Sequence, residues 1–286
     1  MLFWTNDFFT TNEISNVESF YWPDRENKEL EVHFSLSGSV GISLPNAPYS
    51  GLIVNDTLDR EKLNRAIDDL LSDHKLESLD SLIIKQAPNF YSKNSDLLKK
   101  IMNSKNFRAC TEINHHILLD DWESGFSKMQ LRRVNKCQKH GLSFQKESAE
   151  SASSIYHFLS NCRAQQGLEM NIEERRFLKL FDELPDKYWI HTIKDADQKL
   201  YACLVSIVVS PDVLYTFLPA FDRNHSDLSP LSFLYFNLFP ELKSHFFRIL
   251  DMGISSIDGK PQDSLISYKE SIGGIKTQRM TYEIDL

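Results

Sequence analysis

Hydrophobic and polar positions along residues 142–286 recur with the two periods typical of helices and strands. Apolar residues three or four positions apart predict helical faces, and continuous or alternating apolar runs predict strands. The predicted helices are 155–166, 172–184, 230–246 and 263–271. The predicted strands are 142–147, 188–194, 200–209, 213–219, 248–254 and one within 276–284. The resulting order is β-α-α-β-β-β-α-β-α-β.

Turn and cap residues indicate where several of these elements begin and end. Gly167 follows the first helix, and Asn171 is the expected N-cap of the second, which Pro185 stops. Ser229 and Pro230 are expected to open the long third helix, as N-cap and first helical residue. Short polar turns between the strands from 188 to 219 favour antiparallel hairpins.

Residues 31–119 show a weaker version of the same pattern. The predicted strands are 31–36, 39–44, 51–54, 81–87 and 111–119, and the predicted helices begin near Asp59 and Ser95. Their order, β-β-β-α-β-α-β, matches the second half of the C-terminal order. We therefore predict an α+β fold with an N-terminal domain at 1–120, a basic interdomain helix at 121–141 and a C-terminal domain at 142–286.

Composition supports a folded protein without metal or disulfide support. Of the 286 residues, 41% are hydrophobic and 25% charged, which is typical of globular chains. The four cysteines, Cys110, Cys137, Cys162 and Cys203, stand singly, so neither structural zinc nor a disulfide framework is expected. The net charge of −8 and a pI near 5.6 argue against general nucleic-acid binding.

The sequence also predicts a cytoplasmic protein without a membrane span. Residues Met1–Asp7 carry no basic segment or cleavage site typical of a signal peptide. The most apolar stretch, Tyr201–Phe221, is interrupted by Ser210-Pro211-Asp212, and it falls short of the roughly 20 apolar residues that a spanning helix needs.

Residues 249–274 carry the most informative pattern. An apolar strand leads to Asp251-x-Gly253, a polar loop and a short helix that ends on Tyr268-Lys269 before a pair of glycines at 273–274. Together with Arg163-x-x-x-Gly167, Tyr215, Ala220 and Ser229-Pro230, in that order, this pattern resembles the FemAB-like branch of the GNAT-type N-acyltransferases over about residues 30–286. The resemblance implies two GNAT-like domains, each a mixed, largely antiparallel sheet flanked by helices. Members transfer an acyl or aminoacyl group to an amine, many of them in cell-envelope or polysaccharide metabolism.

Lys269, Asp251 and Tyr215 are the predicted catalytic residues. The family's matching lysine lies in the acyl-transfer cleft, and a fixed cation stabilises the oxyanion formed during amide synthesis. Asp251 is a candidate general base, or else a carboxylate that bonds nearby backbone N–H groups. Tyr215 is a candidate acid for the leaving group, or else a packing residue. The alternative for Lys269 is a solvated side chain near a helix C-terminus.

Four further residues are predicted to contact substrate: Arg163, Arg223, Ser229 and Tyr268. Arg223 and Ser229 lie where GNAT enzymes hold the donor pyrophosphate on a glycine-rich turn and helix N-terminus. Here residues 221–228 contain no glycine, and Asp222 and Asp227 are expected to repel phosphate. This departure leaves the donor open between acyl-CoA and aminoacyl-tRNA, with an ordinary capped helix start as the alternative.

A basic helix is predicted within 122–141. Lys128, Arg132 and Lys136 are four residues apart and therefore share one face. That face is a candidate surface for tRNA or a nucleotide-linked acceptor, or else a solvated interdomain face. The adjacent His115 and His116 point to opposite sides of a strand and give no metal signal.

We therefore predict an N-acyltransferase that joins an acyl or aminoacyl group to an amine of a small molecule, peptide or sugar. A non-catalytic ligand-binding or partner-binding protein with the same fold is the alternative.

Overall fold

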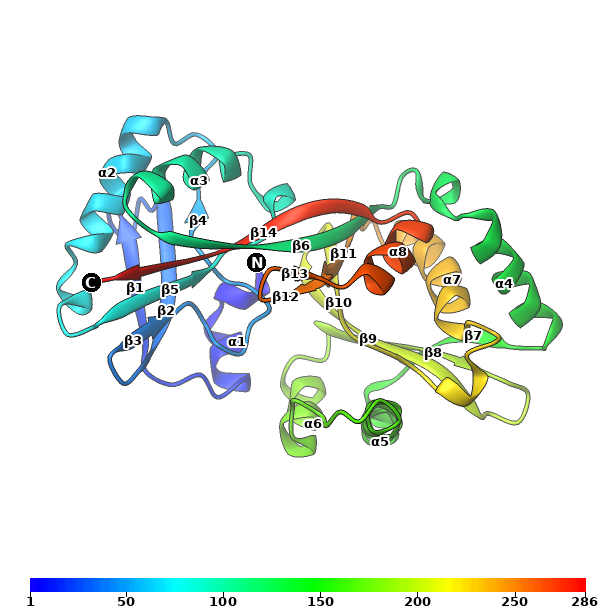
Figure 1. The fold of residues 1–286 in the computed structure, drawn as a ribbon. Coiled ribbons are helices and arrows are strands. Elements are labelled where there is room, and N and C mark those ends of the chain that lie inside the picture. Colours follow the sequence, from blue (N-terminus) through cyan, green and yellow to red (C-terminus); the bar gives the residue numbers. More distant parts are fainter. The chain divides into compact units, whose positions relative to one another are not determined.

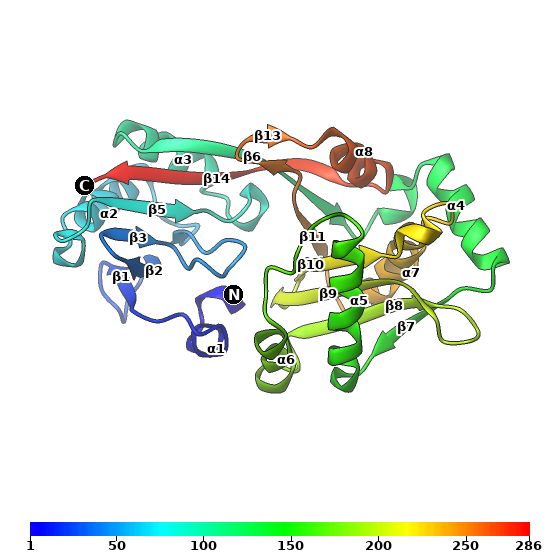
Figure 2. The ribbon, with the colours of Figure 1, turned by 60° about the horizontal axis from the view of Figure 1, so that its bottom comes forward.

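The computed structural model describes residues 1–286, with the backbone alone at residue 124 (Figures 1 and 2). Its contacts form two compact units, and each unit draws on separate stretches of chain. Unit 1 comprises residues 1–2, 115–253 and 263–276, and unit 2 comprises residues 3–114, 254–262 and 277–286. The predicted domain division at 1–120, 121–141 and 142–286 stays a prediction.

Unit 1 has a mixed sheet with helices on both faces. The strand order is β6-β11-β10-β9-β8-β7; β7 to β10 pair antiparallel, and β10 and β11 pair parallel. The strands are β6 Arg108–Leu118, β7 Ser143–Glu147, β8 Tyr188–Lys194, β9 Leu200–Ser210, β10 Val213–Phe221 and β11 Ile249–Ile254. The helices are α4 Lys128–Lys139, α5 Ala152–Ala164, α6 Glu174–Glu183, α7 Pro230–Ser244 and α8 Asp263–Ser271. Short 3₁₀ turns lie at Trp122–Gly125, Ala149–Ser151 and Arg223–His225.

The periodic apolar faces explain this layering. Helices α5 and α6 lie on one side of β8, β9 and β10, and α7 lies on the other (Figures 1 and 2). The α7 face buries Leu234, Leu238 and Leu242 against Leu204 and Leu250 of the strands. Each of these leucines is almost fully withdrawn from water, which is worth about 1.5–3 kcal/mol per side chain.

Unit 2 has its own sheet and core. Its strands follow the order β1-β2-β3-β5-β14-β6, with β4 paired to β2. The strands not yet given are β1 Val17–Trp22, β2 Leu30–Ser37, β3 Val40–Ile42, β4 Ile53–Val54, β5 Ser81–Lys85 and β14 Ile275–Asp285. The helices are α1 Asn6–Thr11, α2 Arg60–Leu71 and α3 Ser95–Ser104, with 3₁₀ turns at Leu2–Trp4, His74–Leu76 and Asn89–Tyr91. Buried residues of α2 and α3 pack on one face of these strands, Leu63, Ile67 and Ile101 among them.

The α+β fold class is confirmed, with a mixed and mostly antiparallel sheet, but some local predictions were wrong. Helix α6 begins at Glu174, so Glu173 rather than Asn171 occupies its N-cap position, without a side-chain capping hydrogen bond. Ser229 precedes α7 in the left-handed region, with φ of 54°, and its hydroxyl makes no capping hydrogen bond. The predicted polar loop at 255–262 contains the hairpin strands β12 Ser256–Ile257 and β13 Lys260–Pro261. The basic helix is shorter than predicted, at Lys128–Lys139.

Candidate active site

The parallel pairing of β10 and β11 stops partway along both strands. The register pairs Val213 with Ile249, then Leu214 with Leu250, and ends with Tyr215 opposite Asp251. Beyond it, β10 continues to Phe221 paired only with β9, through an irregular register near Thr216. The two strands therefore part immediately after Tyr215 and Asp251, and two predicted catalytic residues lie side by side at this point.

Gly253 shapes the end of β11 at this opening. Its φ of 69° lies in the left-handed region, and its N–H donates to Oδ1 of Asp251 at 2.9 Å. A Cβ atom at this position would lie 3.1 Å from the Tyr215 hydroxyl, so the tyrosine covers the glycine closely. Asp251 is fully buried and makes the local backbone bond that one interpretation of the sequence predicted. Glycine is required here both for its backbone conformation and for the room that Tyr215 takes.

Lys269 comes to the same place from the last turn of α8. Its Nζ donates to the Gly253 carbonyl oxygen at 2.9 Å, and only 6% of the residue is exposed. Burial lowers the pKa of Lys269 to about 7, and the charge of Asp251 opposes that shift. The pKa of Lys269 therefore lies near neutral pH, and its side chain is buried rather than solvated at a helix end. The structure thus brings Lys269, Asp251 and Tyr215 together around Gly253.

The paired glycines fix how α8 ends. The Gly274 N–H donates to the Lys269 carbonyl at 2.8 Å, and a Cβ on Gly274 would lie 2.6 Å from that oxygen. Gly273, with φ of 96°, packs so closely on Gly125 that a Cβ on Gly125 would lie 2.6 Å from the Gly273 Cα. Side chains at these positions would displace the turn that carries Lys269. The sequence pattern therefore has a direct steric cause.

His115, for which the sequence predicted no catalytic role, is a neighbour of this site. It is fully buried on β6, and its Nε2 lies 3.9 Å from a carboxylate oxygen of Glu270. Burial lowers the pKa of His115 to about 4, with further lowering from the charges of Lys269 and Lys276. A neutral imidazole therefore lies near the lysine. The strand alternation placed one histidine on each face, but it gave no means of choosing His115.

Tyr268 adjoins Lys269 in the sequence but points elsewhere. Its hydroxyl is buried, and its ring packs against the core of unit 1 near Tyr235. Burial and the neighbouring Tyr235 raise the pKa of Tyr268. Successive helical residues lie about 100° apart, so one enters the core while the next reaches the opening. The structure does not place the Tyr268 hydroxyl with Lys269, Asp251 and Tyr215, which we call the Lys269 group.

The other predicted contacts lie outside the Lys269 group. Arg163, in the last turn of α5, donates through Nε to the Glu169 carbonyl at 2.6 Å and ties down the following loop. Arg223 is exposed, and its N–H donates to Gln165 Oε1 at 2.9 Å. The Ser229 hydroxyl donates to the Ser226 carbonyl oxygen at 3.4 Å.

The junction between β10 and α7 is closed by its own side chains. Asp222 accepts hydrogen bonds from the Asn224 N–H at 3.0 Å and from Gln165 Nε2 at 2.9 Å. Asp227 pairs with Lys136 of α4, with Nζ and Oδ2 at 2.7 Å. Of these contacts, the one from Asn224 occupies a backbone N–H of the junction. Asp222 caps the 3₁₀ turn Arg223–His225, and the two carboxylates of the junction suit a pyrophosphate poorly.

One of the three cations on the basic face of α4 is held in an ion pair. Lys136 is paired with Asp227, whereas the exposed Lys128 and Arg132 make no ion pair with any residue that the structure describes. Val134 and Cys137 on the opposite face are buried in the core. Two solvated cations of the predicted three remain available to a phosphate-bearing partner.

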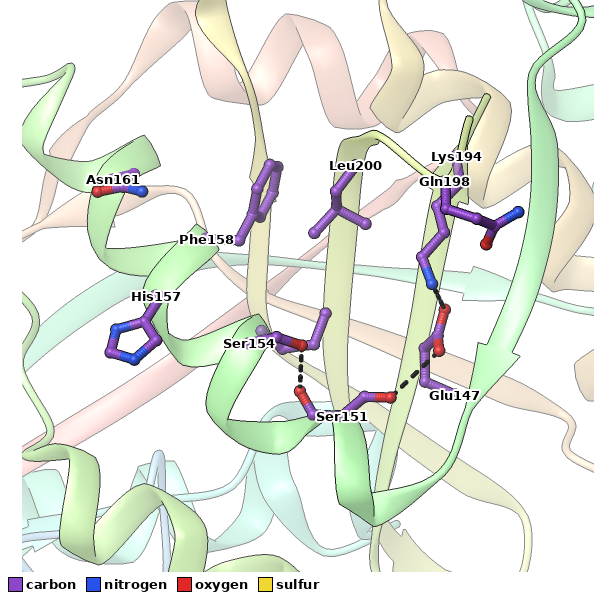
Figure 3. A pocket seen from close by; sticks show the side chains of 10 residues that line it. Glu147, Ser151, Ser154, His157, Phe158, Asn161, Lys194, Gln198 and Leu200 are labelled. Carbon is purple, nitrogen blue, oxygen red and sulfur yellow. Dashed lines mark hydrogen bonds and ion pairs between the residues drawn. The ribbon is translucent and has the colours of Figure 1, made fainter. Parts of the chain in front are cut away.

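A separate pocket of about 360 Å³ lies between α5 and the strands at the β7 side of unit 1 (Figure 3). Glu147 lines it and accepts from Lys194 at 2.7 Å, from Thr192 at 2.6 Å and from Ser151 at 3.3 Å. Phe158 and Leu200 supply apolar surface. None of the predicted site residues lines this pocket.

Comparisons with known proteins identify the fold. No family model and no curated protein sequence matches the chain. Among solved structures, the chain is similar to FemX, with a TM-score of 0.71 at 11% identity, over 98% of this chain and 91% of FemX. The fold is of the FemAB-like, GNAT type. A second similar structure is L-PGS from Bacillus licheniformis, with a TM-score of 0.63 at 13% identity over 94% of this chain and 84% of that protein.

A tandem GNAT protein from the clavulanic acid biosynthesis pathway is also similar, with a TM-score of 0.52 at 10% identity over 94% of this chain and 82% of that one. The predicted resemblance is confirmed at the level of the fold. In the part of the chain that the structure describes, no helix combines the length and apolar character needed to cross a bilayer.

Proposed function

We propose that the protein is an N-acyltransferase that transfers an acyl or aminoacyl group to an amine at the opening between β10 and β11. The observation that carries this proposal is the Lys269 amine, which is buried, fixed on the Gly253 carbonyl and located where the two strands part. Burying an amine costs free energy unless its contacts repay it. A buried lysine with a lowered pKa at such an opening is typical of a functional site rather than of a solvated lysine at a helix C-terminus.

Each residue of the Lys269 group has a role in this proposal. The acceptor amine attacks the acyl carbonyl, a C–N bond forms, and the bond from the acyl carbon to the donor oxygen or sulfur breaks. Protonated Lys269 stabilises the oxyanion of the tetrahedral intermediate. The Tyr215 hydroxyl gives its proton to the leaving group and regains one from the attacking amine. Asp251 is a positioning residue, because it holds Gly253 and its charge favours the protonated form of Lys269.

We further propose aminoacyl-tRNA as the donor in preference to acyl-CoA. The β10–α7 junction lacks glycine and holds two carboxylates where a CoA pyrophosphate would need backbone N–H groups. Lys128 and Arg132 provide exposed cations suited to a phosphate backbone. Binding of fluorescent tRNA should weaken with added salt and with Lys128→Glu plus Arg132→Glu. Equal binding by the Lys62→Glu control and the double variant would exclude this surface.

A donor-consumption assay with a mixture of amine acceptors tests the reaction itself. We expect protein-dependent release of the acyl group to the amines, and its loss in Lys269→Met. The matched control is Lys276→Met, an exposed lysine of the same unit. Activity that survives in Lys269→Met would refute the assigned site.

A non-catalytic ligand-binding protein is the second candidate, favoured by the closed β10–α7 junction. Thermal shifts with acyl-CoA, aminoacyl-tRNA and free amines separate the two proposals, because ligand stabilisation grows with the logarithm of concentration. A shift with an amine alone, without release from any donor, would favour the binding protein.

A further inference from the structure

Two cations lie together on one face of the unit 2 sheet, away from the α2 and α3 core. Lys85 on β5 is opposite Thr281 on β14, and Arg279 is two residues along β14 from Thr281. Side chains two residues apart on a strand point to the same face, so Lys85 and Arg279 are diagonal neighbours there. Their core-facing neighbours, Ile84 and Met280, are buried on the other face.

Neither cation has a carboxylate partner among the described residues. Among the side chains that the structure describes, Lys85 has no hydrogen-bond or ion-pair partner for its ammonium, and Arg279 donates from Nη1 to the Pro48 carbonyl at 2.7 Å. The Arg279 Nε is buried and makes no hydrogen bond. Glu283 on β14, the other diagonal neighbour of Lys85, pairs with Arg108 at 3.1 Å. Glu112, the acid on the adjacent strand β6, is held by Ser256 and by the Gly259 N–H. Both basic side chains are half-buried, so water solvates their charges only in part.

The electrostatic consequence is visible in Lys85. Burial lowers the pKa of Lys85, and the neighbouring charge of Arg279 lowers it further. Two like charges without a counter-ion oppose each other in a partly dehydrated place. Departures of this kind from ordinary pairing are found at functional sites.

The surrounding backbone holds this place rigidly. The Lys85 N–H donates to Ser43 Oγ at 2.7 Å, and the Ser50 N–H donates to the Lys85 carbonyl at 3.0 Å. Gln86 bonds both the N–H and the carbonyl of Leu52, each at 2.8 Å. Gly51 is required beside it, since a Cβ there would lie 2.3 Å from Gln86 Oε1. Segment 43–52, which includes Pro48, is therefore fixed along β5.

We propose that Lys85 and Arg279 bind a phosphate or pyrophosphate group of a ligand on this face of unit 2. The guanidinium offers planar donors, Nε among them, and the ammonium adds a point charge, which together suit tetrahedral oxyanions. This site goes beyond the proposed transfer chemistry, and it does not depend on Lys269.

Calorimetric and thermal-shift titrations with inorganic pyrophosphate at constant ionic strength test the site without any transfer assay. We expect saturable binding and a rise in Tm with the logarithm of pyrophosphate concentration. Lys85→Met and Arg279→Met should each weaken binding about tenfold or more, the loss expected for one charge-assisted hydrogen bond. Lys85→Arg should retain it. The control Lys62→Met removes an exposed lysine paired with Glu29 and should leave affinity unchanged.

The source of the phosphate is separated by two further titrations. Tighter binding of a nucleoside diphosphate than of pyrophosphate would indicate a nucleotide-linked ligand, and equal binding would indicate recognition of the phosphates alone. Equal affinity for succinate would overturn the phosphate assignment. Unchanged pyrophosphate affinity in a folded Lys85→Met variant, or an equal loss in Lys62→Met, would overturn the site.

Discussion

Lys269 in unit 1 and Lys85 in unit 2 are both withdrawn from water, but their surroundings differ. Lys269 is almost fully buried, bonds the Gly253 carbonyl and feels the charge of Asp251. Lys85 is half-buried, has no partner for its ammonium in the described part of the chain, and lies beside Arg279. Burial lowers the pKa of both. The difference is that the first site supplies its own counter-charge, whereas the second leaves room for one from a ligand.

The largest expected effect is the pH dependence of stability contributed by Lys269. Its pKa is about 7 in the folded protein and 10.5 in its ordinary state. Between these values the unfolded chain holds more protons, so the stability of the folded protein rises with pH. Relative to Lys269→Met, the wild type should gain about 3–5 kcal/mol from pH 7 to pH 10.5. Below pH 7 the two profiles should run parallel.

Urea unfolding of wild type and Lys269→Met across this pH series measures the effect. Tyr215, Asp251, His115, Glu270 and Lys276 are charged or titratable groups near Lys269, and all are retained in the variant. Lys276→Met is the control, and its profile should follow the wild type. Parallel curves for wild type and Lys269→Met from pH 7 to pH 10.5 would contradict the buried, depressed lysine.

The next effect is on catalysis. Removing one oxyanion-stabilising donor costs about 10²–10³ in kcat, which is the loss expected for Lys269→Met. If the ammonium is the active form, wild-type kcat should also decline as the pH rises through about 7. Donor-consumption rates across pH decide this. A rate that increases through that pH would indicate that the neutral amine acts as a base instead.

Adding a methyl group at a glycine should cost more stability in unit 1, at Gly274, than in unit 2, at Gly41. In Gly274→Ala, the new methyl group would meet the Lys269 carbonyl at 2.6 Å, and we expect a loss of about 1–3 kcal/mol together with reduced transfer. In Gly41→Ala of unit 2, the new methyl group would meet the ends of the Leu79 and Leu82 side chains at 3.0 and 3.1 Å and the Phe34 ring at 3.4 Å. This variant should cost less stability, because these are side-chain rather than backbone atoms. Equal losses of stability in the two variants would show that the turn after α8 tolerates a side chain.

The sequence predicts unit 1 well because its elements are long and strongly periodic. Strand β8 and helix α8 have the predicted bounds, and the Lys269 pattern leads to the group formed with Asp251 and Tyr215. In unit 2, the helix at Asn6–Thr11 and the strand at Val17–Trp22 were missed, since both are short and carry mixed patterns.

Contacts between distant residues account for the rest. The pairing of Lys136 with Asp227 reduces the basic face of α4, and no local pattern in the sequence indicates it. The direction of Tyr268 depends on how α8 docks on the core. Lys85 and Arg279 become neighbours only because the C-terminal strand β14 pairs with β5.

The smallest effect concerns Lys85 itself and completes the comparison of the two lysines. Because its folded pKa is lowered, the charged form costs stability below that pKa, and the cost disappears as the pH rises toward the ordinary range of lysine. Lys85→Met should therefore stabilise the anion-free protein at neutral pH by a few tenths to about 1 kcal/mol. Saturating pyrophosphate should reverse the order of the two proteins. Urea unfolding with and without pyrophosphate measures both, and a Lys85→Met variant that is less stable without the anion would show that Lys85 already has its partner.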